Sequence, residues 1–266
     1  MSDLFVATPK DVDFWKKEIN RSKFINNALT VDFETTPAFI KSVLPPYLEM
    51  PREGNYMSMM IENYRSTING DFNSSLLNVS CHHPAFEHDI RYMLVLYINN
   101  TMADAMGREM WGEPKKEAVT SLHFNGDDVY AFIDRRGKRI VEINAKLGPE
   151  LKPEGCIYYS TQIKCPPTAP FKALEEQPPI IFTTQIDMQR YRYREAVSGN
   201  LRMNGSKWDP VDQVPILNIR KIHLSEQRSN TRIHHMAQLP GSRYDYYPYL
   251  FGTMYDRFEL FSKPGL

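Results

Sequence analysis

The chain of 266 residues carries 32 basic and 32 acidic residues, and 42% of its residues are hydrophobic. This length and composition are typical of a globular protein with a sizeable buried core, and they argue against a disordered or fibrous chain. The balanced charge gives no reason to expect a nucleic-acid partner or an anionic membrane as partner. No apolar run reaches about 18 residues, so no transmembrane helix is predicted.

Signals for targeting, disulfides and phosphate binding are also lacking. Residues 1–6 do not have the basic start and long apolar run of a signal peptide. The three cysteines form no CxxC pair and are too few for a disulfide framework, so we expect a cytoplasmic protein. The few scattered glycines form neither a phosphate-binding loop nor a nucleophile elbow, which argues against kinases, dehydrogenases and common hydrolases.

In the first half of the chain, short helices and strands alternate. Helices are predicted over residues 9–19, 36–44 and 102–110. Strands are predicted over residues 28–33, 56–62 and 91–99. Thr36-Pro37 is a favourable helix start, and Pro45-Pro46 ends that helix. The apolar run over residues 91–99 indicates a strand that is buried on both faces.

The second half is expected to consist mostly of strands. They are predicted over residues 128–134, 139–145, 156–164, 180–195 and 214–225. A turn at Arg135-Arg136-Gly137-Lys138 joins the first two as a hairpin. Alternation along the fourth strand places Arg190, Arg192 and Arg194 on one face, which we expect to meet solvent or an interface. The aromatic tail over residues 244–261 also suggests an interface, and no composition break divides residues 1–266, so we expect a single domain.

Two adjacent lysines, Lys115 and Lys116, are the most informative residues for chemistry. A lysine with an ordinary pKa of about 10.4 is neutral in only about one molecule in 2,500 at pH 7, and only the neutral amine attacks a carbonyl. Burial or a second cation lowers the pKa of a lysine. A reduction of about 3–4 units would require about 4–5 kcal/mol of differential solvation, which an apolar pocket could supply. From the residues alone, a solvated surface pair remains the alternative.

The segment that contains these lysines resembles the signature of the acetoacetate decarboxylase superfamily. It reads Gly107-Arg108-Glu109, then four residues, then Pro114-Lys115-Lys116. The segment Leu44–Glu49 and the strand that precedes Gly107 also fit the family. The resemblance implies an α+β, β-rich fold: a mixed β-barrel with short flanking helices, usually in a homo-oligomer.

The same resemblance implies a catalytic mechanism. Lys115 would form a Schiff base with a keto acid, and Lys116 would point out of the pocket and orient or perturb its neighbour. A lysine activated by desolvation or by a second cation is the established device of acetoacetate decarboxylase. The protonated imine would serve as the electron sink, so neither a metal nor an organic cofactor is implied.

The sequence departs from the family in the residues that bind acetoacetate. The family's carboxylate-binding arginine would fall near Asn26-Asn27, and the glutamate nearest the lysine would fall near Leu76. Because these groups are absent, we expect a decarboxylase that acts on another keto acid. The alternatives are an aldolase-dehydratase that joins or cleaves a pyruvate-like keto acid and an aldehyde, and a non-catalytic binding relative.

Further residues are predicted to complete the site. Glu113 is a candidate proton shuttle and Glu62 a candidate pocket acid, with ion pairs to Lys116 and Arg65 as their respective structural alternatives. Tyr92 and Tyr249 are candidates for substrate binding. Arg108 and Glu109 are expected to form a structural ion pair. The histidines at 82, 83 and 88 lie in a Pro-containing segment that does not fit a helical zinc motif, so no metal site is predicted.

Overall fold

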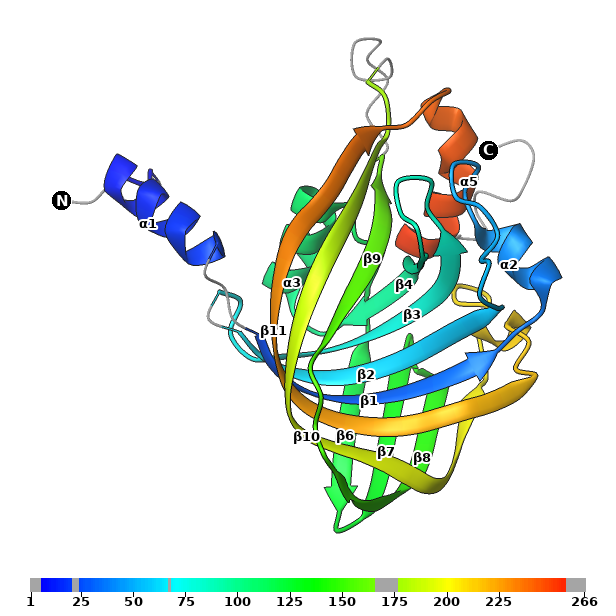
Figure 1. Ribbon diagram of the computed structural model, residues 1–266. Coiled ribbons are helices and arrows are strands. Elements are labelled where there is room, and N and C mark those ends of the chain that lie inside the picture. The colour runs from blue at the N-terminus through cyan, green and yellow to red at the C-terminus, as the bar shows by residue number, and fades with distance from the viewer. Residues whose placement is uncertain (1–5, 21–23, 67, 166–176, 257–266) are drawn as a thin grey trace.

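The structure is a computed structural model that describes residues 6–20, 24–66, 68–165 and 177–256. Eleven strands of these residues form one sheet (Figure 1). In the first half they are β1 (Phe24–Glu34), β2 (Tyr56–Ser66), β3 (Phe72–His82), β4 (Asp89–Ile98) and β5 (Lys115–Glu117). In the second half they are β6 (Val119–Asn125), β7 (Asp128–Arg135), β8 (Lys138–Leu151), β9 (Cys156–Lys164), β10 (Ile180–Met203) and β11 (Asn218–Gln238).

Seven of the strands close into a barrel. Their order is β11-β1-β2-β3-β4-β9-β10, and pairing between β10 and β11 completes the ring. The barrel is mixed, because β4 runs parallel to β9 whereas the other pairs of the ring are antiparallel. The long strand β10 continues beyond the ring and pairs with β8, which leads to β7 and β6. These three strands extend from the lower part of the barrel in Figure 1. The predicted β-rich α+β class and the barrel are confirmed.

The two faces of the barrel wall differ in polarity. Along β11, Gln227 and Ser229 are buried whereas Asn230 is exposed, so the face with Gln227 is the barrel interior. Pairing between strands extends this interior face across the wall, where it carries many buried polar side chains, including Asn26, Glu62, Ser74, Asn78, Ser160 and Gln162. The opposite, outer face carries apolar side chains that form the main core, including Leu29, Val31, Met57, Met59, Leu77 and Val79.

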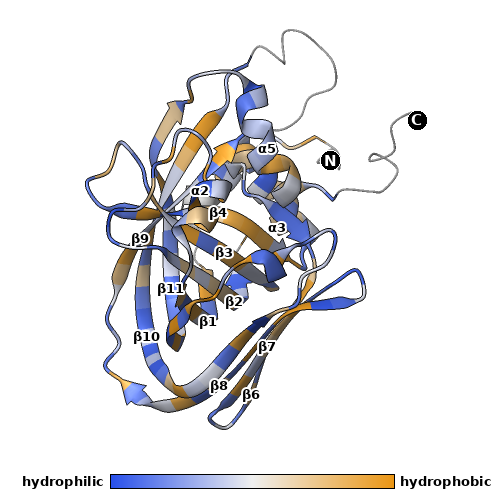
Figure 2. Ribbon diagram, turned by 90° about the vertical axis from the view of Figure 1, so that its right-hand side faces the viewer, coloured by the Kyte–Doolittle hydropathy of each residue, from blue (hydrophilic) through white to orange (hydrophobic). Residues whose placement is uncertain are grey.

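This outer core explains why both faces of the central strands are buried. It packs against Val129 and Ile143 of the β6–β8 extension and against Ile40 of the helix α2 (Pro37–Val43). It also packs against Tyr246 and Leu250 of the helix α5 (Arg243–Met254). Orange and blue segments alternate along the strands of the barrel in Figure 2, as expected for strands with one apolar and one polar face. The expected strand with two buried faces is confirmed as β4.

Two further helices and two short helical turns belong to the described part of the chain. Helix α1 (Pro9–Asn20) begins where predicted, with Thr8 hydrogen-bonded to Asp11, and stands away from the barrel in Figure 1. Helix α3 (Thr101–Met106) runs directly into the π-helical turn η1 (Gly107–Trp111), and together they replace the predicted helix over 102–110. The turn η2 (Val211–Gln213) follows β10. No helix of the described residues is long and apolar enough to cross a bilayer.

The predicted element bounds hold best for short apolar strands and capped helices. The hairpin between β7 and β8 is confirmed, with Arg136 and Gly137 at positive φ, as a tight two-residue turn requires. The strand over 156–164 is confirmed as β9. The last strand was predicted too early, because residues 214–217 precede β11. Strands β3, β5 and β6 and helix α5 were not predicted.

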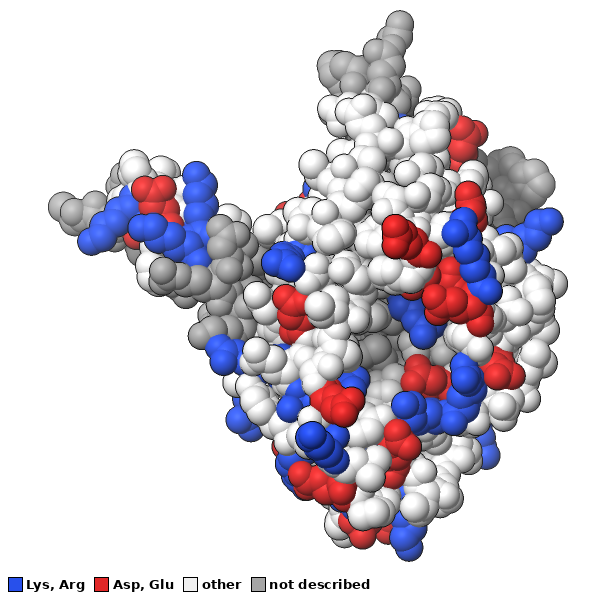
Figure 3. Space-filling model, viewed as in Figure 1, with Lys and Arg blue, Asp and Glu red and all other residues white. Residues whose placement is uncertain are grey.

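The arginine face predicted on the fourth C-terminal strand is wrong in part. The register of β10 on β11 shifts between Arg190 and Arg192, and this bulge reverses the face that the next side chains occupy. Arg192 therefore points outward to Glu150 and Glu226, whereas Arg190 pairs with the buried Gln227 and its Nε is buried. On the face of the molecule in Figure 3, acidic and basic side chains are interspersed, as the balanced charge suggests. Residues 257–261 of the aromatic tail lie outside the described residues.

Candidate active site

The adjacent lysines lie on opposite faces of the short strand β5. This strand runs parallel to β4, with Lys115 opposite Leu96 and Lys116 opposite Tyr97. Leu96 belongs to a small apolar cluster with Leu76, Met93, Ile98 and Ala103, whereas Tyr97 belongs to the outer core. Lys115 therefore faces the barrel interior and Lys116 faces the outer layer, although both side chains are almost fully buried.

The amine of Lys115 contacts one main-chain carbonyl and one carboxylate. Its Nζ donates to the carbonyl oxygen of Ala103 in α3 at 2.7 Å and lies 2.7 Å from Oε2 of Glu113. Glu113 is the more exposed of the pair, with 21% of its side-chain area accessible against 9% for Lys115. A carboxylate at this distance can accept a proton from the amine or return one to it.

Two glycines allow the chain to present Lys115 in this position. A Cβ on Gly107 would lie 2.2 Å from both Nζ of Lys115 and Oε2 of Glu113, so only glycine leaves room for the pair. Gly112 ends η1 with φ of 71°, and a Cβ there would meet the Cα of Lys164 in β9 at 2.6 Å. The glycines of the motif therefore serve a close approach and a left-handed turn, and the π-helical turn between them is a form often found at functional sites.

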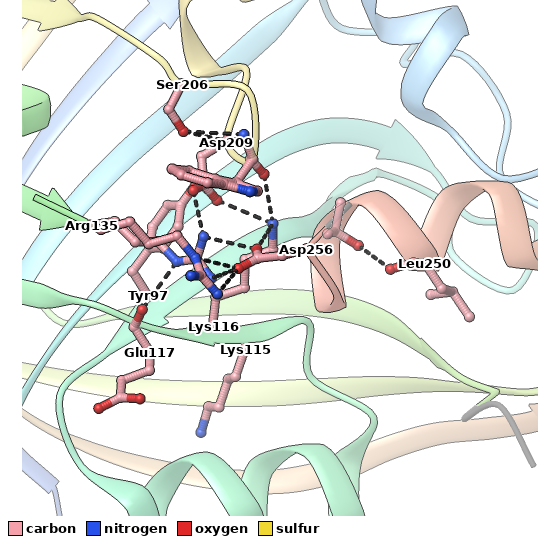
Figure 4. A network of polar contacts seen from close by, with 12 residues as sticks. Tyr97, Lys115, Lys116, Glu117, Arg135, Ser206, Asp209, Leu250 and Asp256 are labelled. Atoms are coloured by element: carbon pink, nitrogen blue, oxygen red, sulfur yellow. Dashed lines mark hydrogen bonds and ion pairs between the residues drawn. The ribbon is translucent and has the colours of Figure 1, made fainter. Parts of the chain in front are cut away.

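Lys116 is held in a buried network of ions on the outer side of β5. Its Nζ lies 3.1 Å from Oδ1 of Asp209 and 3.5 Å from Oδ1 of Asp256, and it donates to the carbonyl oxygen of Trp208. Arg135 bridges the same two aspartates at 2.6 Å and 2.9 Å. Figure 4 shows Lys115 pointing away from this network. The network therefore fixes β5 from behind and keeps the charge of Lys116 away from the amine of Lys115.

The same network perturbs its members. Burial raises the pKa of Asp256, but hydrogen bonds from Arg135 and Arg136 outweigh this effect and hold it below its usual value. Burial and the neighbouring Asp209 raise the pKa of the Tyr97 hydroxyl, which donates to Oδ1 of Asp209. Asp256 therefore stays ionised and Tyr97 stays neutral at physiological pH, so their contacts to the network persist.

Glu62 is a fully enclosed acid on the interior face. Asn26 donates to its Oε1 at 2.7 Å and the hydroxyl of Tyr64 donates to its Oε2 at 2.9 Å. Burial raises the pKa of Glu62 to about 7, and the two hydrogen bonds offset only part of this rise. Glu113 contributes to the raised pKa of Tyr64, which places the Glu62–Tyr64 pair within electrostatic reach of the carboxylate beside Lys115. Glu62 does not form the ion pair with Arg65 that was considered as its structural alternative.

The remaining predicted residues lie elsewhere. Tyr92 points to the outer core, on the face of β4 opposite to Leu96. Burial raises the pKa of the Tyr92 hydroxyl, and Tyr249 lies close enough to raise it further. The structure therefore does not bring Tyr92 or Tyr249 to Lys115. The expected ion pair between Arg108 and Glu109 is not formed either. Arg108 instead donates to the carbonyl oxygen of Lys115 and stacks over the ring of Tyr255.

Several residues of the site were not predicted. Asn26 was noted only as the place where the family's arginine is missing, yet it binds Glu62. Tyr64 lies two residues after Glu62 on the same strand face, a spacing that could have indicated it. Asp209 follows Lys116 by 93 positions and Asp256 follows Arg135 by 121, so no local pattern indicates either aspartate.

The histidine-rich segment has a packing role in the structure. The rings of His83, Phe86 and His235 pack edge to face, and Tyr159 packs against Phe86 and His234. Among the described residues, no three side chains of His, Cys, Asp or Glu are grouped so as to hold a metal ion. Burial, followed by the neighbouring His235, lowers the pKa of His83 to about 4, so this ring is neutral at physiological pH.

Two sequence comparisons relate the chain to acetoacetate decarboxylases. A sequence model of the family Acetoacetate decarboxylase (ADC) matches residues 8–236. An acetoacetate decarboxylase from Ralstonia nicotianae is 32% identical over 117 residues, a match that spans 44% of this chain and 44% of that relative.

Two solved structures share the fold. The enduracididine biosynthesis enzyme MppR, complexed with pyruvate, matches with a TM-score of 0.68 at 14% identity over 82% of this chain and 90% of that one. The acetoacetate decarboxylase of Legionella pneumophila matches with a TM-score of 0.68 at 17% identity over 81% and 87% of the two chains. Because the family model covers most of the sequence, the chain belongs to the acetoacetate decarboxylase family.

Proposed function

We propose that the chain is a carbon–carbon lyase that acts on a keto acid through an imine at Lys115. The observation that carries this proposal is the separation of the two lysines by β5. Lys115 reaches the barrel interior with one carboxylate beside it, whereas Lys116 is held by Asp209 and Asp256 on the other side. Imine formation requires an amine that is shielded from solvent and lies next to a group that can take its proton.

The proposed reaction begins when Nζ of Lys115 attacks the ketone carbon of the substrate. Glu113 takes a proton from the amine and returns one to the carbinolamine oxygen, which leaves as water. In the resulting iminium ion, a bond to the carbon next to the iminium carbon breaks. Its electron pair forms the carbon–carbon double bond of an enamine while the C=N π electrons move to the nitrogen. If that bond holds a carboxylate, CO2 leaves and an enamine remains. Protonation of the enamine carbon and hydrolysis then release the product ketone and the free lysine.

The Glu62–Tyr64 pair supplies the proton for the enamine in this proposal. A carboxyl group with a pKa of about 7 is protonated in about half of the molecules at neutral pH and can therefore donate a proton or accept one. Tyr64 and Asn26 fix the orientation of this carboxyl group. Decarboxylation of a keto acid other than acetoacetate is our first assignment, because the family is named for decarboxylation and no arginine occupies the expected carboxylate site.

An aldolase-dehydratase is the second candidate. Two carboxyl groups, those of Glu113 and Glu62, are available for proton transfer at the interior face. An aldol condensation with loss of water requires such transfers repeatedly, to and from carbon and oxygen. The similar fold of an enzyme complexed with pyruvate makes pyruvate a reasonable test substrate. The two candidates share the imine at Lys115 and differ in the bond that is aligned with it.

A paired assay distinguishes these reactions. Release of CO2 is measured from a series of β-keto acids, and loss of pyruvate is measured with and without added aldehydes. A decarboxylase releases CO2 without an aldehyde, and an aldolase-dehydratase consumes pyruvate only when an aldehyde is present. Lys115→Ala is expected to reduce either activity to background, while Lys138→Ala, at an exposed turn lysine, should not change it. Full turnover by Lys115→Ala would contradict the proposal.

A further inference from the structure

Arg91 places a cationic side chain on the interior face of the barrel and forms no ion pair within the part of the chain that the structure describes. It lies opposite Ser80 on β3 and opposite Ser160 on β9, and Ser160 is a fully buried residue of the interior face. Its Nη1 atom is buried and has no hydrogen-bond partner among the described residues. A buried guanidinium nitrogen without an acceptor is costly, and native proteins tolerate such a group mainly where a ligand or water completes it.

Neighbouring side chains on the same face also have buried polar atoms without hydrogen-bond partners among the described residues. Gln162 lies two residues beyond Ser160 on β9 and is almost fully buried, and neither Oε1 nor Nε2 has a partner within the described ranges. Asn78 on β3 donates to the hydroxyl of Tyr158, but no donor from the described residues reaches its buried Oδ1. Three adjacent strands, β3, β4 and β9, thus contribute unfilled hydrogen-bonding capacity to one region of the barrel interior.

The charge of Arg91 acts across this region. Burial raises the pKa of Asp32, and Arg91 is the strongest of the cations that lower it. Burial likewise raises the pKa of Tyr158, which Arg91 lowers and Glu62 raises, so both charges act on Tyr158. Strand pairing places Glu62 and Lys115 toward one end of the interior face and Arg91 toward the other.

We propose that Arg91, together with the Nε2 amide of Gln162, binds a carboxylate of the substrate at a distance from Lys115. Because β4 contains a bulge, Arg91 and Leu96, the partner of Lys115, lie opposite Ser80 and Leu76 of β3. These are four positions apart, which corresponds to about 13 Å along the strand. A substrate held at both points must extend along the barrel, unlike acetoacetate, whose carboxylate lies two bonds from the ketone. The substrate class is a longer keto acid with a distal carboxylate and polar groups opposite Gln162. This assignment rests on the proposed imine at Lys115.

A pair of ketones matched in length tests the assignment. 5-Oxohexanoate is a methyl ketone with a distal carboxylate, and 2-hexanone is its counterpart without the carboxylate. The concentration for half-maximal borohydride trapping is measured for both. Arg91→Met is expected to raise this concentration about tenfold or more for 5-oxohexanoate, as loss of a charge-assisted hydrogen bond requires, and to leave it unchanged for 2-hexanone. Arg91→Lys should give an intermediate concentration for 5-oxohexanoate. The control is Arg192→Met, at an arginine that points outward, and it should change the concentration for neither ketone.

Binding without imine chemistry separates failure of this inference from failure of the proposed function. Hexanoate is titrated calorimetrically into the wild-type chain and each variant, and thermal melting confirms that the variants fold. Binding of hexanoate that depends on Arg91 supports the carboxylate site even if no ketone is trapped, and in that case only the imine is refuted. Equal binding of hexanoate by the wild type and Arg91→Met would overturn the inference. A markedly lower melting temperature of Arg91→Met would also overturn it, because it would indicate a structural role.

Discussion

Gly107 determines how closely the α3–η1 segment can approach the amine of Lys115. Replacing it with alanine would add a methyl group 2.2 Å from Nζ of Lys115 and from Oε2 of Glu113. Both atoms are at the ends of flexible side chains, so we expect them to move and the fold to remain. Displacement of a reacting group by about 1 Å can slow a reaction about a hundredfold, and we expect imine trapping in Gly107→Ala to slow by about tenfold to a hundredfold.

The control for this change is Gly252→Ala in α5. Apart from its own stretch of helix, no heavy atom of the described residues lies within 4 Å of a Cβ at that position, so we expect the same substitution to be harmless there. Trapping rates and melting temperatures are compared for the two variants and the wild type. An unchanged trapping rate in Gly107→Ala would show that the contact between this turn and Lys115 does not matter for the amine.

Glu62 links the interior of the barrel to a pH dependence of stability. Its pKa is about 7 in the folded chain against an ordinary value of 4.5. Between these values the folded state retains a proton that the unfolded state releases, so the free energy of unfolding falls as the pH rises from about 4.5 to 7. The full shift corresponds to about 3 kcal/mol. Glu62→Gln keeps a hydrogen-bonding group there without a titration, and its unfolding free energy should fall less over this pH range.

Urea unfolding of the wild type and Glu62→Gln at several pH values measures this difference. The exposed carboxylate Glu87 provides the control, and Glu87→Gln should follow the wild-type curve. Because other carboxyl groups, such as that of the half-buried Asp32, also have raised pKa values, the difference between variants is the quantity to compare. Parallel curves for Glu62→Gln and the wild type would refute the raised pKa of Glu62.

Strand β5 has only three residues, so its position depends on what lies on either side of it. One side pairs with β4, and the outer side is anchored by the ion network around Lys116. Lys116→Met removes one cation from two buried aspartates, and breaking a buried pair in this way costs about 3 kcal/mol. We expect this loss in urea unfolding, together with slower but measurable trapping at Lys115. Lys138→Met, at an exposed turn, should lose little, and equal stability of the two variants would contradict the anchoring role.

At the scale of elements, the sequence predicted what short-range rules control. Thr36 at the helix cap, the Arg136-Gly137 turn and the apolar run of β4 were found where local patterns placed them. Strand β3 was missed because its interior face is polar, with Ser74 and Asn78 where a core strand would have apolar residues. The bulge after Arg190 was missed because nothing local marks a one-residue shift in register.

At the scale of the whole molecule, closure of the barrel explains both the success and the limits of the sequence analysis. The motif around Lys115 could be identified because its glycines, proline and lysines lie within ten residues. The partners of that motif could not, because β1, β2, β9 and the loop at Asp209 reach it only through strand pairing over long distances. The polar interior inside an apolar outer layer is likewise a property of the closed ring.

The closed ring also determines which side chains can share a substrate. It brings Lys115, Glu62 and Arg91 to one interior face and excludes Tyr92 and Lys116, although both are neighbours of those residues in sequence. Under the proposed function, a substrate inside the barrel would meet an amine and two carboxyl groups toward one end and a guanidinium group toward the other.

Borohydride trapping with site mapping tests the imine at Lys115 most directly. The protein is incubated with acetoacetate, pyruvate and 5-oxohexanoate, reduced, and analysed by intact mass and peptide mapping. We predict one stable adduct per chain, on Lys115, with no adduct on Lys116, and none in Lys115→Ala. The absence of an adduct with every carbonyl compound, or an adduct on Lys116 in place of Lys115, would contradict the account.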